Sequence, residues 1–322
     1  TEVLKSQKNA ASKMIAQAKK EGRDATSKRL VDFYGFAIRR QERFLARVNG
    51  TALVSEDPIL DKWKFTNAYR ILDRVSQYMV KNIIDDRANR FEFPRAHRMG
   101  MFLFRLFNSI ETWESLPEYK YDAYNALPAI ESFVEARRAC GVTVYNNAYM
   151  MTPPWTFGCT TRTELFLRTL KHMEDSGDLE RAYNSSDMRY TYAIFRRHEG
   201  FGDFLAYQFA LDFSYNHLMF DYEKFIVPGI GCQRGMRRVW PHLKLIELPS
   251  VRKRLTINGI PSFPVLTVDG KEFPLRGNDM QNLFCEYDKY CRVRDDGKSI
   301  KNNFSRILSP LEQPYIPSAW RF

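Results

Sequence analysis

The stretch KWKFTNAYRILDRVSQYMV, residues 62–80, is the starting point for predicting the fold of this chain. Asp57 and Pro58 precede it as a suitable N-cap and first-turn residue, so the sequence predicts a helix from Ile59 to about Ile84. One face of this helix is apolar and is expected to lie in the core. It consists of Phe65, Leu72, Val75 and Met79.

The other face of the predicted helix is the first candidate binding surface. Its residues lie three or four positions apart and are Thr66, Arg70, Asp73 and Gln77. A polar stripe is usually only a surface that faces solvent. Here a cation and a carboxylate lie one turn apart and short polar side chains replace Lys and Glu, which favours a ligand-binding face.

Further helices are predicted along the rest of the chain, at residues 95–108, 123–140, 162–176, 188–198, 202–219, 233–240 and 279–292. Residues 254–275 break this pattern, because β-forming residues alternate around the turn dipeptides Asn258-Gly259 and Asp269-Gly270. The sequence therefore predicts a mainly α protein with a small inserted β-hairpin.

The N-terminal segment, residues 2–47, is predicted to be an amphipathic helix that ends at Asn49-Gly50. It carries a basic stripe of Lys19, Lys20, Arg23, Lys28, Arg29, Arg39, Arg40, Arg43 and Arg47. This stripe is either a solvated helix face or an arm that follows a nucleic-acid backbone. We expect residues 1–50 to form a basic helical extension and residues 51–322 to form a single helical domain, with the β-ribbon at about 254–275.

The charge of the chain indicates an anionic partner. Its 322 residues include 49 Lys and Arg against 38 Asp and Glu, which gives a formal net charge of +11. Nucleic acid is the commonest partner of so basic a chain. The five cysteines and five histidines form no metal-ligand pattern, so no metal is expected. No apolar run approaches the roughly 20 residues that span a membrane, and neither a signal peptide nor a membrane anchor is expected at the N-terminus.

The turn Pro228-Gly229-Ile230-Gly231 joins two predicted helices and has the composition of a helix-hairpin-helix element. Glycines at such a turn let the backbone approach a phosphate, and the following helix offers free N–H groups. The alternative is an ordinary glycine-containing turn. We favour DNA contact because a cluster of cations follows at once, at Arg234, Arg237 and Arg238.

The run Cys285-Glu286-Tyr287-Asp288-Lys289-Tyr290 places two carboxylates and a lysine within one and a half helical turns. Closely spaced carboxylates can differ in pKa and act as a base and an electrostatic stabiliser, although surface helices often carry similar runs. A phosphate-binding loop of the kinase type is excluded at Gly297-Lys298-Ser299, because the position five residues before Gly297 is Arg292 and not glycine.

Taken in order, these segments resemble a known family. Residues 62–80 resemble the signature of the helical domain associated with viral 5-hydroxymethyluracil DNA kinases, and are equally similar to the related α-glutamyl/putrescinyl thymine pyrophosphorylase group. The resemblance extends from about Asp57 to Arg292. It also includes the FRLFN run at 104–108, residues 202–208, Asp212, the Pro228-Gly229 turn with Arg234-Gly235, and the run at 285–290.

The resemblance implies a fold like that of helical DNA glycosylases and a role in the hypermodification of thymine in phage DNA. There, the hydroxymethyl group of the base is phosphorylated twice, and a transferase then displaces pyrophosphate with an amino acid or a polyamine. Because the chain lacks a phosphate-binding loop, we interpret it as the transferase. The alternatives are a DNA glycosylase and a non-catalytic module that binds DNA with a modified base.

In this interpretation the target nucleotide is flipped out of the duplex. Arg70 and Arg74 are the candidates that stabilise the leaving pyrophosphate, and the candidate bases are Asp288, Glu286 and Asp73. Asn67 and Gln208 are expected to read the base edge, and Tyr207 or Phe204 to stack on the base. The rest of the predicted substrate site consists of Thr66, Gln77, Asp212 and Lys289.

The predicted partners are double-stranded DNA that carries modified thymine and an amine co-substrate. No cofactor and no membrane are expected. We expect a monomer in the cytoplasm of a phage-infected bacterium. Gly229 and Gly231 complete the predicted DNA-binding set with the three arginines that follow them.

Overall fold

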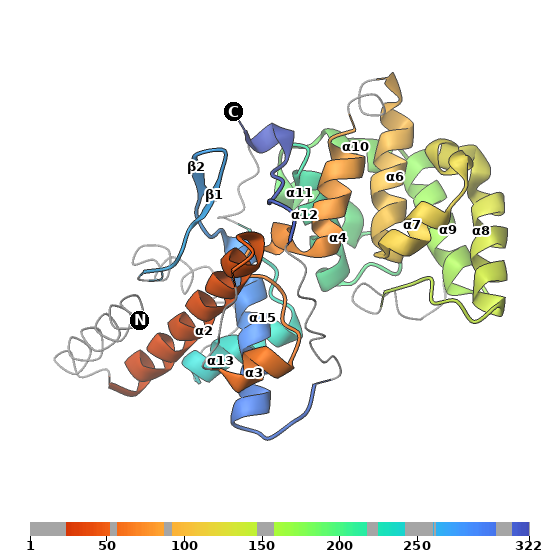
Figure 1. The fold of residues 1–322 in the computed structure, drawn as a ribbon. Helices are drawn as coiled ribbons and strands as arrows, with labels where there is room; N and C mark the ends of the chain where they lie inside the picture. Colours follow the sequence, from red (N-terminus) through yellow and green to blue (C-terminus); the bar gives the residue numbers. More distant parts are fainter. Residues whose placement is uncertain are drawn as a thin grey trace. The chain divides into compact units, whose positions relative to one another are not determined.

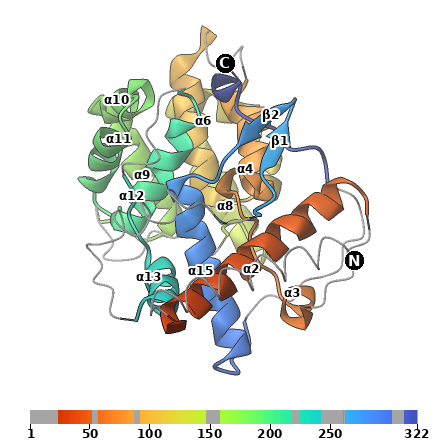
Figure 2. The same cartoon turned by 90° about the vertical axis from the view of Figure 1, so that its left-hand side faces the viewer.

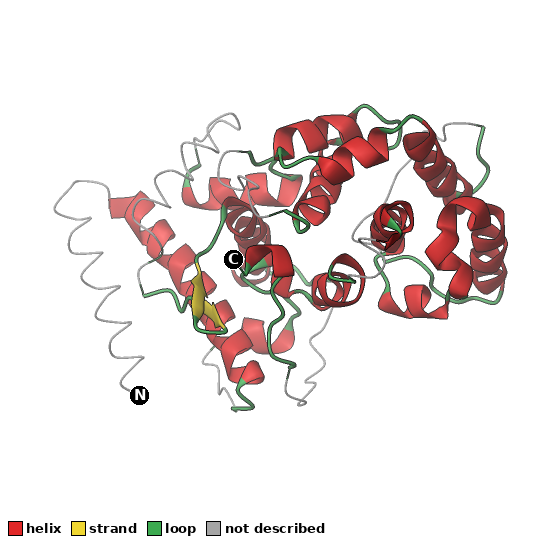
Figure 3. Ribbon diagram, turned by 90° about the horizontal axis from the view of Figure 1, so that it is seen from above, coloured by secondary structure: helices red, strands yellow, loops and turns green. Residues whose placement is uncertain are grey.

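The protein is mainly helical and has one small antiparallel sheet, as Figure 3 shows in a computed structural model. The structure describes residues 24–51, 57–86, 92–146, 158–217, 225–241, 260, 262–300 and 311–321. The predicted α-rich architecture with an inserted β-hairpin is therefore confirmed. Two compact units make up the chain: residues 1–73 with 222–314, and residues 74–221 with 315–322.

The first unit is built around the long helix α15 (Gly277–Arg294). Figures 1 and 2 both show α2 (Asp24–Val48) and α13 (Ile230–Val239) beside it. Phe33 of α2 stacks on Phe284 of α15 with ring centres 4.4 Å apart, and Tyr287 meets Phe33 edge-on at 5.3 Å. The N-terminal basic helix, where it is described, thus contributes its apolar face to the core of this unit.

The small sheet also belongs to the first unit. Strand β1 (Leu266–Val268) pairs with β2 (Lys271–Phe273), and the turn between them has positive φ at Asp269 (51°) and Gly270 (76°). Asp-Gly is the dipeptide that this kind of turn favours, so the hairpin predicted at these two residues is confirmed. The second predicted turn dipeptide, Asn258-Gly259, lies outside the described residues.

The second unit contains most of the remaining helices. They are α4 (Arg74–Met79), the π-helical turn η2 (Val80–Ile84), α6 (Pro94–Phe107), α7 (Ile110–Ser115), η3 (Glu118–Asp122), α8 (Ala123–Ala139), α9 (Arg162–Asp175), α10 (Asp178–Asn184), α11 (Met188–Arg196), α12 (Asp203–Ser214) and η5 (Ser318–Trp320). Phe102, Phe195 and Phe209 form its aromatic core, with ring centres 4.8–6.3 Å apart. Most of these helices match the predicted ones, whereas the short α7 and α10 were not predicted.

The single helix predicted over residues 59–84 is wrong. Asp57 does cap a helix, α3 (Pro58–Lys62), through its Oδ1 atom, but α3 has only five residues. An irregular segment follows, then a 3₁₀ turn η1 (Arg70–Leu72), and then α4. Because the helix is broken, the polar residues at 66, 70, 73 and 77 do not share one helix face.

The predicted helix-hairpin-helix element is seen only in its second half. Helix α13 begins at Ile230, directly after Gly229, so Ile230 and Gly231 of the predicted turn already belong to the helix predicted at 233–240. The predicted first helix, 202–219, ends at Ser214 as α12, and the described residues 225–229 ahead of the turn are not helical.

Candidate functional site

The polar face of α15 organises the candidate site in the first unit. Asp279, Asn282, Glu286 and Lys289 lie three or four residues apart and so share one side of this helix. That side holds the irregular segment 63–73, which carries the polar residues singled out by the sequence. The segment therefore owes its shape to side chains more than 200 residues away.

Thr66 is the centre of these contacts. Its backbone N–H donates to Glu286 Oε2 at 2.8 Å, and its hydroxyl donates to Asn282 Oδ1 at 3.1 Å. Asn282 Nδ2 in turn donates to the carbonyl oxygen of Asn67 at 2.8 Å. Lys289 completes this group, because its Nζ atom contacts both the Lys64 carbonyl and Glu286.

Arg40 of α2 also binds the backbone of this segment. Its Nη2 atom donates to the carbonyl oxygens of Phe65 at 3.0 Å and Thr66 at 2.8 Å. Burial lowers the pKa of Arg40 to about 10, and the nearby Glu286 carboxylate opposes that shift. The backbone groups that would close a helix at residues 65 and 66 are thus bonded to side chains, which explains why the helix breaks here.

Arg70 and Asp73 lie at the end of the segment. The backbone N–H of Arg70 donates to Asp279 Oδ1 at 2.7 Å, and Arg70 Nη1 lies 3.9 Å from Asp73 Oδ2. The Arg70 side chain is only 7% exposed, whereas Asp73 is 27% exposed. Asp73 Oδ1 also accepts from the Asn67 N–H at 3.4 Å. The predicted cation and carboxylate are therefore neighbours, although not on one continuous helix.

Asp279 links Arg70 to the start of α15. Its second oxygen accepts from the Arg276 N–H at 2.9 Å. Burial raises the pKa of Asp279 to about 6, against the opposing effect of the two N–H groups that favour the carboxylate. A carboxyl with a raised pKa in the folded state binds a proton at a pH where the unfolded chain does not.

We therefore predict that Asp279 makes the protein less stable as pH rises from about 4 to about 6. The folded chain holds the extra proton in this window, so the free energy of unfolding falls with rising pH, by up to about 3 kcal/mol from this residue. Urea unfolding of wild type and Asp279→Asn at each pH measures the effect. The stability difference between them should shrink across the window, and a constant difference would contradict the prediction.

Helices α13 and α15 pack with their backbones close together. A Cβ atom at Gly235 would lie 1.8 Å from the Phe284 carbonyl oxygen, and one at Gly231 would lie 2.5 Å from Cys285 Sγ. The two glycines lie four residues apart on the face of α13 that meets α15. Packing is thus a sufficient reason for glycine at 231, which the sequence had linked to phosphate contact.

This close packing brings arginines to Asp288. The carboxylate is 1% exposed and lies 2.9 Å from Arg234 Nε, 3.6 Å from Arg238 Nε and 3.3 Å from Arg292 Nε. Arg237, the remaining predicted DNA-binding arginine, is exposed on α13. Asp288 therefore differs from Glu286 and Asp73, because three guanidinium groups surround it.

The other predicted residues belong to the second unit. Tyr207, Gln208 and Asp212 are buried on α12. Asp212 forms a buried ion pair with Arg105, whose Nη2 atom donates to Asp212 Oδ1 at 2.8 Å. Phe204, also on α12, is exposed. Arg74 pairs with Glu111 at 2.7 Å, and Gln77 bonds to the backbone of Tyr315 at 3.0 and 2.8 Å.

The sequence did not identify several residues that hold the site together. They are Arg40, Asp279, Asn282 and Arg292. The spacing of Asp279, Asn282, Glu286 and Lys289 was a usable signal, because it marks one polar helix face. The sequence held no such signal for Arg40, because its partners are backbone carbonyl groups.

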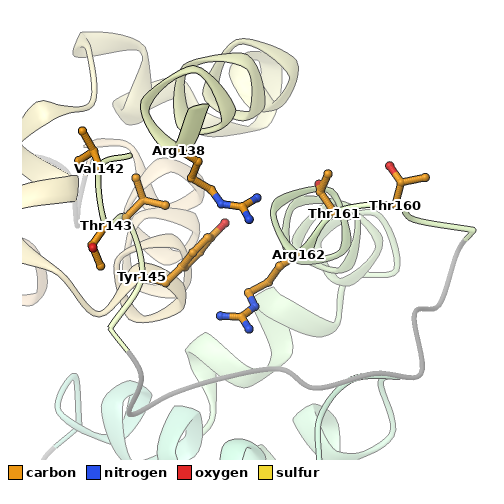
Figure 4. Close-up of a pocket in the computed structure, with 8 residues that line it drawn as sticks. Arg138, Val142, Thr143, Tyr145, Thr160, Thr161 and Arg162 are labelled. Atoms are coloured by element: carbon orange, nitrogen blue, oxygen red, sulfur yellow. The ribbon is translucent and has the colours of Figure 1, made fainter. Parts of the chain in front are cut away.

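A cavity of about 420 Å³ lies in the second unit between the end of α8 and the start of α9 (Figure 4). Arg138, Tyr145 and Arg162 line it. Arg138 donates to Glu135 at 2.8 and 3.0 Å, and the Arg162 guanidinium lies 5.6 Å from the ring centre of Tyr145. None of the residues predicted from the sequence lines this cavity.

The chain matches the family described as "5-hmdU DNA kinase, helical domain" over residues 27–299. It belongs to this family, as the resemblance of residues 62–80 and the later segments predicted. A curated relative, the "5-hmdU DNA kinase" of Bacillus phage SP10, is 25% identical over 209 residues. That match covers 59% of this chain and 32% of the relative, so the chain spans about a third of that protein's length. No solved structure matches.

None of the described helices is both long and apolar enough to cross a membrane. Among the same residues, no group of three or more His, Cys, Asp or Glu side chains is arranged to hold a metal ion.

Proposed function

We propose that this chain binds DNA with a modified thymine and replaces the pyrophosphate of 5-pyrophosphoryloxymethyl-deoxyuridine with an amine. The observation that carries the proposal is that Thr66 and Asn67 bond to the face of α15 that carries Glu286 and Lys289, and that Asp73 accepts from the Asn67 N–H beside them. These residues come from the runs at 62–80 and 285–290, two of the segments that resemble the family. The formal charge of +11 suits a polyanionic substrate.

The reaction would break one bond and form one. The nitrogen of the amine attacks the methylene carbon on the base, and a C–N bond forms. The C–O bond to pyrophosphate breaks, and its electron pair leaves with the pyrophosphate oxygen. The attacking ammonium must first lose a proton to a base, and the protein would supply that base and the cations that stabilise the leaving group.

Asp73 is the best supported of the three candidate bases. Its side chain is 27% exposed, compared with 11% for Glu286 and 1% for Asp288. A base has to reach the proton that it accepts, so exposure matters. Glu286 is engaged with Thr66 and Lys289 and would hold the segment in place. Arg70, 3.9 Å from Asp73, would add positive charge near the leaving pyrophosphate.

A non-catalytic DNA-binding module is the second candidate. Thr66, Asn67 and Glu286 are bonded mainly to one another and to the backbone, which a scaffold would also require. The match to one third of a larger protein named as a kinase also fits a module that presents modified DNA to another domain. In either case the proposed partner is double-stranded DNA, and the proposed location is the cytoplasm of a phage-infected bacterium.

The product identifies the function. The protein is incubated with duplex that contains the pyrophosphorylated base and with a mixture of amino acids and polyamines. The DNA is then digested and its nucleosides are analysed by mass spectrometry. We expect an aminated nucleoside. An abasic site would indicate a glycosylase, and unchanged DNA that remains tightly bound would indicate the module.

A further inference from the structure

The arginine cluster around Asp288 has an unusual arrangement. Arg234 and Arg238 reach the carboxylate from α13, and Arg292 reaches it from the next turn of α15. Asp288 is 1% exposed, but the three arginine side chains are 49%, 30% and 35% exposed. The carboxylate is therefore covered by guanidinium groups that themselves remain open to solvent.

The cluster carries more positive charge than its carboxylates neutralise. Arg238 also forms a two-pronged pair with Asp296, at 3.1 and 2.6 Å. Three guanidinium groups, those of Arg234, Arg238 and Arg292, thus face the two carboxylates of Asp288 and Asp296. Asp295, the residue before Asp296, pairs instead with Arg294, which also forms an ion pair with Asp32. Among the described residues, Asp288 is the one ion-pair partner of Arg234 and Arg292.

The contacts also fix the direction in which the guanidinium groups face. Arg234 and Arg292 approach Asp288 with their Nε atoms. Within the part of the chain that the structure describes, their terminal Nη atoms form no further ion pair and can bind a second anion. Arginine binds phosphate through two parallel N–H bonds, so an arginine held by one carboxylate is prepared for such a ligand.

We propose that Arg234 and Arg292 form a binding site for a phosphate group of the DNA backbone, and that Asp288 is the positioning residue that orients them. This inference rests on DNA being the substrate, as proposed above. It removes Asp288 from the candidate bases, because a fully buried carboxylate with three guanidinium partners is poorly placed to collect a proton from an amine.

The first test removes the two arginines that depend on Asp288. Binding of the full chain to unmodified duplex is measured against salt concentration for the Arg234→Gln, Arg292→Gln double variant. The matched control is Arg168→Gln, Arg196→Gln, which removes two half-exposed arginines, each also paired with an acid. We expect about a 10-fold loss of affinity and a salt slope smaller by about 1–2 in the first variant only. Equal effects in both variants would overturn the proposal.

The second test uses the sign of the effect at Asp288. Asp288→Asn raises the net charge by one, so a surface that attracts DNA only through its net charge should bind tighter. A positioned site should instead bind about threefold weaker or worse, because the arginines lose their fixed orientation. Tighter binding by Asp288→Asn would overturn the positioning role. Thermal melts of both proteins establish that the variant is folded.

The same arginines could instead bind a free phosphate compound. A third measurement distinguishes this ligand from the phosphate groups of the DNA backbone. Inorganic pyrophosphate is titrated into wild type and the Arg234→Gln, Arg292→Gln variant without DNA. We expect the variant to keep any pyrophosphate binding while losing duplex affinity. Loss of pyrophosphate binding with unchanged duplex affinity would overturn the proposal. Because these measurements use unmodified DNA, they are independent of whether amine transfer occurs.

Discussion

Replacing Arg105 with alanine should destabilise the second unit by about 3–5 kcal/mol. Arg105 is 1% exposed and its partner Asp212 is fully buried, with an N–O distance of 2.8 Å. Arg105 also donates to Asn108 Oδ1 at 2.6 Å. Its removal would leave the Asp212 charge buried without its partner cation, which costs far more than the loss of one hydrogen bond.

Thermal melts of Arg105→Ala measure this effect, and a fall in Tm of roughly 6–20 °C is expected. Arg74→Ala is the matched control, because the Arg74–Glu111 pair is 70% and 66% exposed and should contribute at most about 1 kcal/mol. Adding Asp212→Asn to Arg105→Ala removes the isolated charge and should recover part of the loss. An Arg105→Ala protein as stable as the Arg74→Ala control would show that this buried pair does not stabilise the fold.

The ion pair between Arg105 and Asp212 also illustrates what the sequence could predict. Both residues lie in segments that resemble the family, FRLFN at 104–108 and the region near 202–212. Their contact crosses 107 positions, so no local periodicity connects them. The helices that carry them were predicted because their apolar residues recur at helical spacing over several turns.

The helix predicted over residues 59–84 was wrong for the opposite reason. The local pattern there is helical, but side chains from distant parts of the sequence bind the backbone and break the helix. Arg40 takes the carbonyl oxygens of residues 65 and 66, and Glu286 takes the N–H of Thr66 across 220 positions. Propensity is a weak prior when buried side chains satisfy the backbone instead. Thr66, Asn67 and Asp73 were thus proposed individually as site residues, but the arrangement that joins them through Arg40, Asp279 and Asn282 was not predicted.

The same reasoning applies to the glycines of α13. The sequence linked Gly231 to a phosphate because a glycine after a turn often permits close backbone approach. The structure has a close approach at this residue, but to Cys285 of α15. The spacing of Gly231 and Gly235, four residues apart on one helix face, was a usable signal for close helix packing. A β-branched residue at 231 would disturb the packing of α13, so it does not test DNA contact by itself.

Asp73→Asn should lower the rate of amine transfer by about 100-fold or more, because it removes the proposed base. The substitution keeps the Oδ1 acceptor for the Asn67 N–H and the size of the side chain, so the segment should keep its shape. Single-turnover amination of duplex with the pyrophosphorylated base measures the rate. Glu111→Gln removes an exposed carboxylate of the second unit and is the control for the charge change.

The pH dependence distinguishes a base from a structural carboxylate at Asp73. As pH rises, more of the amine is already deprotonated, so the defect of Asp73→Asn should shrink towards high pH. A structural carboxylate would give a defect that does not follow the titration of the amine. A stable Asp73→Asn protein that aminates DNA at the wild-type rate would exclude Asp73 as the base.

Arg70→Ala should also slow transfer by roughly 100-fold, because a preorganised cation near the leaving group is lost, and Arg70→Lys should recover only part of the rate.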